Sequence, residues 1–177
     1  MALIRFPFPV DQIESPLIST LGACGLIFAA IMLSRLYRTY LKSKREEGRE
    51  LLLMIERIRD GVDYYLTPIK DVLESLTEQS SICRKMHDYI AQGKKPYEAY
   101  LELSDGLRIS KDGKEILDGF FSRISAGYRE GVVAVAEEAR VRFAAYLETS
   151  SEEDEKSGKM VSALLVGGAL AFVLLFI

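Results

Sequence analysis

The chain of 177 residues contains no tryptophan, one histidine and only two cysteines. Cys24 lies in an apolar run and Cys83 in a polar setting, so we expect neither a disulfide nor a cysteine-based metal site. His87 is the only histidine, and a lone histidine on a short helix is more often a surface or core residue than a catalyst or a metal ligand. The formal net charge of −3 and the pI of about 5.4 provide no positive field for phosphates, so no nucleic-acid partner is expected.

Charge is absent from two stretches near opposite ends of the sequence. No charged residue lies between Pro16 and Ser34, and none lies between Met160 and Ile177. Residues 35–159 hold 22 of the 23 basic residues and 24 of the 26 acidic ones. An apolar content of 49% is too high for intrinsic disorder, and this segregation of charge is not typical of an ordinary soluble domain.

The first apolar stretch predicts a transmembrane helix over residues 17–34, because about 17–25 apolar residues suffice to cross a bilayer. Residues 1–16 carry only Arg5 against Asp11 and Glu14. The basic residues that follow the stretch are Arg35, Arg38, Lys42, Lys44, Arg45 and Arg49. By the positive-inside rule, residues 1–16 are then extracytoplasmic and the charged middle is cytoplasmic.

Two processing signals compete with this interpretation. A cleavable signal peptide would carry its positive charges before the apolar core, whereas here they follow it. The segment Leu21–Cys24 resembles a lipoprotein cleavage box, but it opens the apolar run instead of closing it. We therefore favour an uncleaved span.

The second apolar stretch predicts another transmembrane helix over residues 160–177, with Lys156 and Lys159 on its cytoplasmic side. A buried core helix is the alternative, and the complete lack of charge disfavours it. Ser19, Thr20 and Cys24 are the notable polar residues of the two spans, so neither span offers an ionisable path for a proton or an ion.

Helical periodicity without strand-like alternation continues through residues 35–150. The predicted helix starts are Thr67-Pro68, Ser80 or Ser81, Lys95-Pro96 and Ser110, and the predicted breaks are Gly93 and Gly127. We therefore predict an all-α protein, with a cytoplasmic antiparallel bundle of about six helices between an N-terminal and a C-terminal transmembrane helix. Gly48 is interpreted as a joint in the first helix, and residues 151–159 as an acidic, solvated hinge that joins the bundle to the second span.

No motif of an enzyme is found. There is no P-loop, no glycine-rich dinucleotide motif, no HExxH, no GxSxG and no pair of CxxC motifs. The carboxylates of Glu137, Glu138 and residues 152–155 fall in solvent-facing patterns. We predict no catalytic, cofactor-binding or metal-binding residue, and no enzymatic activity.

The order of these features resembles the stage III sporulation protein AB family, a single-domain relative of the inner-membrane platform protein of type II secretion systems. The residues that carry the resemblance are Leu51, Ile55 and Ile58 before Thr67-Pro68-Ile69; Ile90, Gly93, Tyr97 and Ala99; Leu107, Glu115, Leu117 and Phe120; and Glu155-Lys156 with Lys159-Met160. The departures from the family pattern are Gly61, Tyr65, Ile124-Ser125, the position of Gly167-Gly168, and about 16 additional residues at the N-terminus.

This resemblance implies a non-catalytic membrane component of the channel complex between mother cell and forespore. It implies a place in the mother-cell membrane around the forespore, with the bundle in the cytoplasm. The implied partners are the sporulation ATPase, stage III sporulation protein AA, and other membrane subunits. A homo-oligomer of the chain is a further possibility that the resemblance leaves open. Two alternatives also stay open: a platform subunit of a type II secretion or type IV pilus-like machine outside sporulation, and a membrane-anchored signalling adaptor.

Overall fold

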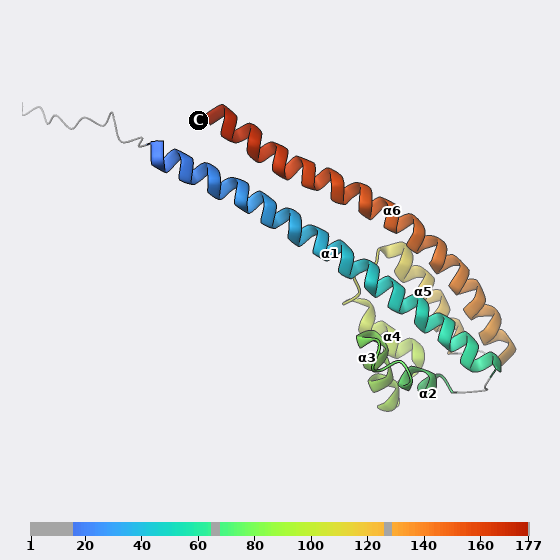
Figure 1. The fold of residues 1–177 in the computed structure, drawn as a ribbon. Coiled ribbons are helices and arrows are strands. Elements are labelled where there is room, and N and C mark those ends of the chain that lie inside the picture. Colours follow the sequence, from blue (N-terminus) through green and yellow to red (C-terminus); the bar gives the residue numbers. More distant parts are fainter. Residues whose placement is uncertain (1–15, 65–67, 126–128, 177) are drawn as a thin grey trace, which may run out of the picture. The chain divides into compact units, whose positions relative to one another are not determined.

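The computed structural model describes residues 16–64, 68–125 and 129–176, and all of its regular elements are helices. The helices, in chain order, are α1 (Pro16–Tyr64), α2 (Ile69–Glu74), α3 (Ser81–Ala91), α4 (Pro96–Ser104), α5 (Lys111–Ile124) and α6 (Arg129–Phe176) (Figure 1). The predicted all-α fold with long apolar helices at both ends is confirmed. Thr67 and Gly127, which were predicted to mark helix boundaries, lie outside the described residues.

The chain forms two compact units, and α1 and α6 contribute to both. The anchor unit comprises Met1–Thr39 and Lys156–Ile177, and the bundle unit comprises Tyr40–Glu155. Each of the two long helices is uninterrupted, with 49 residues in α1 and 48 in α6. The predicted spans are therefore extensions of the first and last helices of the bundle.

Local capping explains why the short helices begin and end where they do. The Ser80 hydroxyl accepts a hydrogen bond from the backbone N–H of Cys83 at the start of α3. Gly93, with a φ of +92°, follows α3 in the left-handed conformation that favours glycine. Glu98 accepts from the backbone N–H of Lys95, the residue before α4. These boundaries agree with the predicted ones.

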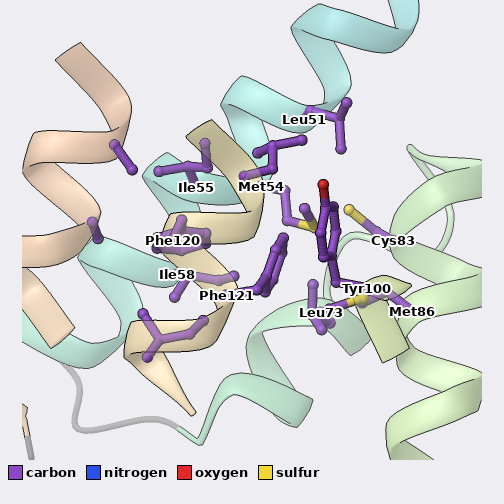
Figure 2. Close-up of a cluster of buried hydrophobic side chains, with 14 of the residues drawn as sticks. Leu51, Met54, Ile55, Ile58, Leu73, Cys83, Met86, Tyr100, Phe120 and Phe121 are labelled. Carbon is purple, nitrogen blue, oxygen red and sulfur yellow. The ribbon is translucent and has the colours of Figure 1, made fainter. Parts of the chain in front are cut away.

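The core of the bundle unit consists of apolar side chains from all six helices. The most buried large residues are Leu51, Met54, Ile55, Ile58, Leu73, Leu76, Cys83, Met86, Leu117, Phe120, Phe121 and Phe143. Figure 2 shows part of this core, in which Tyr100, Phe120 and Phe121 are labelled. Phe121 stacks on Tyr100 and meets Phe120 edge-on, with ring centroids 4.9 Å apart in each pair. The hydroxyl of Tyr100 donates to the carbonyl of Lys114, so this buried polar group is satisfied.

Gly48 is not a joint, because α1 continues through it without a break. A Cβ atom at this position would lie 2.5 Å from Cδ2 of Leu147, a residue of α6 in the bundle unit. The glycine therefore permits close approach of the two helices, and its interpretation as a joint is wrong.

The segment predicted as a solvated hinge, residues 151–159, is helical and forms part of α6. Lys44 Nζ lies 2.8 Å from Asp154 Oδ1, and the two side chains are only 16% and 11% exposed. Arg45 donates to the carbonyl of Ser151 over 2.9 Å. These contacts with α1 stabilise the helix at a place where composition alone suggested a solvated connector.

Candidate functional site

His87, the single histidine, lies on α3 with its side chain 19% exposed. Its Nδ1 is 3.7 Å from Oδ1 of Asp88, which is too long for a hydrogen bond. Cys83 is buried, and that burial raises the pKa of its thiol, which is opposite to the shift that activates a nucleophile. Within the part of the chain that the structure describes, no three side chains of the types that ligate metals come together.

Glu137 and Glu138 lie at the centre of an ion-pair network on the bundle unit. Glu137 accepts hydrogen bonds from Arg140 and Arg59, each at 2.6 Å, and these lower its pKa to about 2. Glu138 accepts from Arg123 over 2.8 Å, which also lowers its pKa. Both carboxylates therefore remain charged at neutral pH, and the network connects α1, α5 and α6 as a structural element without acid–base capacity.

A polar groove lies in the bundle unit between α1, α3 and the segment that follows α4, and we call it the α1–α3 groove. Its volume is about 330 Å³. Its lining residues are Ser43, Glu46, Glu47, Glu50, Ser81, Ile82, Lys85, Leu103, Gly106, Leu107 and Arg108. A second hollow of about 330 Å³ shares Lys85, Leu103 and Gly106 and extends the groove along α3.

Several polar groups of the α1–α3 groove form hydrogen bonds with one another or with neighbouring residues. Glu47 accepts a hydrogen bond from the backbone N–H of Arg108, and the Arg108 guanidinium donates to Ser43. Glu50 accepts from the hydroxyl of Ser80 over 2.7 Å. The contacts of Glu47 and Arg108 thereby join α1 to the segment that follows α4.

The anchor unit presents apolar side chains outward. Only 11% of the apolar window in α1 and 17% of that in α6 are buried, so neither behaves as a core helix of this chain. The exposed large apolar residues are Leu21, Leu26, Phe28, Ile31, Met32, Leu33, Leu36, Met160, Leu164, Leu170, Phe172 and Leu174. The exposed Cys24 lies among them, whereas the side chains of Ser19 and Thr20 are not described.

Polar contacts at Ser162 join the two helices inside the anchor unit. The Ser34 hydroxyl donates to Oγ of Ser162 over 2.7 Å, and both residues are buried. Nε of Arg38 also donates to Oγ of Ser162, over 3.1 Å. Hydrogen bonds between hydroxyls are a common way to join helices in an apolar environment.

Sequence reasoning missed the Lys44–Asp154 pair, because the acidic run suggested uniform solvation. The signal that identifies Asp154 is the spacing of the buried face of α6. Its buried residues in the bundle unit are Val132, Val135, Ala136, Ala139, Phe143 and Asp154. Continued at helical spacing from Phe143, this face reaches Asp154 three turns later.

Taken together, these features define an all-α protein with a charged helical bundle and two helices long and apolar enough to cross a membrane. The family model of stage III sporulation protein AB matches residues 19–177, and the chain belongs to this family. The resemblance inferred from the sequence is thereby confirmed. The family comprises structural and assembly proteins of sporulation and is not a known enzyme family. No curated protein and no solved structure matches the chain.

Proposed function

We propose that the chain is a non-catalytic platform subunit of the channel complex between mother cell and forespore. In this role it couples a cytoplasmic ATPase of the stage III sporulation protein AA type to the membrane subunits of the complex. Membership of a stage III sporulation family supports the cellular context. It also favours this role over a secretion or pilus machine outside sporulation.

The observation that carries the proposal is the continuity of α1 and α6. Each helix supplies core residues of the bundle unit, such as Ile55 and Phe143, and each also supplies an apolar segment of the anchor unit. A continuous helix is a rigid element, whereas a linker rich in glycine and serine would absorb motion. A force applied to the bundle would thus reach the membrane segments through the helix backbone.

The proposed orientation follows from the distribution of basic residues. Residues 17–34 and 160–177 cross the mother-cell membrane around the forespore, residues 1–16 are extracytoplasmic, and residues 35–150 form the cytoplasmic bundle. The basic residues after the first span and before the second span support this orientation.

The α1–α3 groove is the surface that we propose for the ATPase contact. It combines apolar side chains such as Ile82 and Leu107 with charged groups of both signs, as protein interfaces do. Its rim lies on α1, so a partner bound there would act directly on a helix that continues into the membrane segment.

Affinity purification of the full-length, tagged chain from sporulating cells in mild detergent tests the proposal. We expect the ATPase and at least one further membrane subunit to copurify. A photoreactive amino acid at Lys85, in the groove, should then cross-link to the ATPase, whereas one at the exposed Val141 on α6 serves as the matched control. Purification of an intact, membrane-inserted chain without the ATPase would contradict the coupling role, and equal cross-linking at both positions would contradict the assignment of the groove.

A further inference from the structure

The charges of the described residues of the anchor unit are all of one sign. The described residues of this unit, 16–39 and 156–176, include no aspartate or glutamate. Their charged residues are Arg35, Arg38, Lys156 and Lys159, and all four are exposed. They directly follow the first apolar segment or directly precede the second, so the charge is concentrated at one end of the unit.

The hydrogen bonds of Ser162 bring the basic residues of α1 close to those of α6. Because Ser34 and Ser162 are bonded, Arg35 and Lys159 lie within one helical turn of the same contact. Arg38 donates to Ser162 through Nε, which leaves both terminal nitrogens of its guanidinium for another acceptor. Among the described residues, neither Arg35 nor Arg38 forms a salt bridge with a carboxylate.

We propose that Arg35 and Arg38, which we call the basic collar, bind the phosphate headgroups of anionic phospholipids. The proposal rests on the membrane insertion of both apolar segments proposed above. A guanidinium fixed through Nε presents its terminal N–H groups in the paired geometry that suits phosphate oxygens. Arg38, held by Ser162, is therefore the ordered ligand, while Arg35 adds long-range attraction to an anionic surface.

The occupant is assigned as a lipid because of what surrounds the collar. The exposed apolar residues Leu33 and Leu36 flank Arg35 on α1, and Met160 follows Lys159 on α6. A ligand at this place thus meets phosphate-binding groups next to apolar side chains. A phospholipid can contact the phosphate-binding groups with its headgroup and the apolar side chains with its acyl chains, whereas a free phosphate ion can contact only the phosphate-binding groups.

Native mass spectrometry of the full-length chain in detergent tests this inference. The protein is titrated with phosphatidylglycerol or with phosphatidylcholine of the same acyl chains. The variant is Arg35→Gln with Arg38→Gln, and the matched control is Arg57→Gln with Lys70→Gln, two exposed bases of the bundle unit. Circular dichroism verifies the helical content of each protein.

We expect the native chain to bind phosphatidylglycerol at least tenfold more tightly than phosphatidylcholine, since each base near an anionic surface strengthens binding about fivefold. The collar variant, which lacks two bases, should lose about 25-fold in affinity for phosphatidylglycerol and none for phosphatidylcholine, and the control should equal the native chain. Equal affinities of the native chain for the two lipids, or an unaltered collar variant, would overturn the inference. Displacement of the lipid by an equal concentration of inorganic phosphate would also overturn it, in favour of a site for free phosphate. Failure of the chain to insert into membranes would instead count against the proposed function.

Discussion

Replacement of Asp154 by alanine removes one partner of the most buried ion pair that joins α1 to α6 in the bundle unit. The Lys44 ammonium, 16% exposed, would lose its carboxylate acceptor at 2.8 Å. Breaking a fully buried pair costs about 3–5 kcal/mol, and the residual exposure here reduces this to about 2–3 kcal/mol. For a domain of this size we expect a decrease in Tm of about 10 °C.

The assay is thermal unfolding, followed by circular dichroism, of a fragment that spans residues 40–159 and includes both partners. Glu153→Ala is the control, because Glu153 is an exposed acid next in sequence to Asp154, and it should change the stability by less than about 0.5 kcal/mol. The double variant Lys44→Met with Asp154→Met should recover most of the lost stability, because it leaves no unpaired charge. Equal melting of the Asp154→Ala and Glu153→Ala fragments would refute the reasoning, because the Lys44–Asp154 pair would then contribute no more than an exposed acid does.

Further predictions concern the core, the pH dependence and the residues without a function. Phe120→Ala should destabilise the fragment of residues 40–159 by about 3–5 kcal/mol, because this side chain is 1% exposed and its loss leaves a cavity; an unchanged Tm would contradict the described core. The folded-state pKa of Glu137 is about 2 against an ordinary 4.5, so its contribution is complete above about pH 5 and is lost as the pH falls toward 2. The Tm difference between native and Glu137→Gln fragments should therefore shrink over that pH range, and a constant difference would exclude the ion-pair origin. His87→Ala and Cys83→Ser should leave the yield of heat-resistant spores near the native level, and a loss in stable, membrane-inserted protein would reopen the search for an active site.

Helix positions could be predicted from the sequence because their causes are local. Ser80 caps α3 through its own hydroxyl, and Gly93 adopts a positive φ that few other residues tolerate. Each of these signals acts within a few residues of the boundary that it marks. The order and spacing of such signals were also sufficient to identify the family.

Contacts between distant residues could not be predicted in the same way. Gly48 and Leu147 are about one hundred residues apart in sequence, and nothing near Gly48 indicates that its missing side chain makes room for α6. The acidic run near Asp154 has the composition of a connector, and only the pairing with Lys44 shows that one face of it is buried. The absence of catalytic residues is still a prediction, because the fold does not test it.

Removal of the second apolar segment tests the central claim, that the chain acts in sporulation as a bundle held at the membrane by two helices. Heat-resistant spores would be counted in the native host with its chromosomal copy replaced by the full chain or by a chain without residues 161–177. Immunoblots would confirm equal amounts of the two proteins, and limited proteolysis would confirm a folded bundle. The account predicts normal sporulation with the full chain and severe loss with the truncated one. Equal spore counts from a stable truncated protein would contradict it.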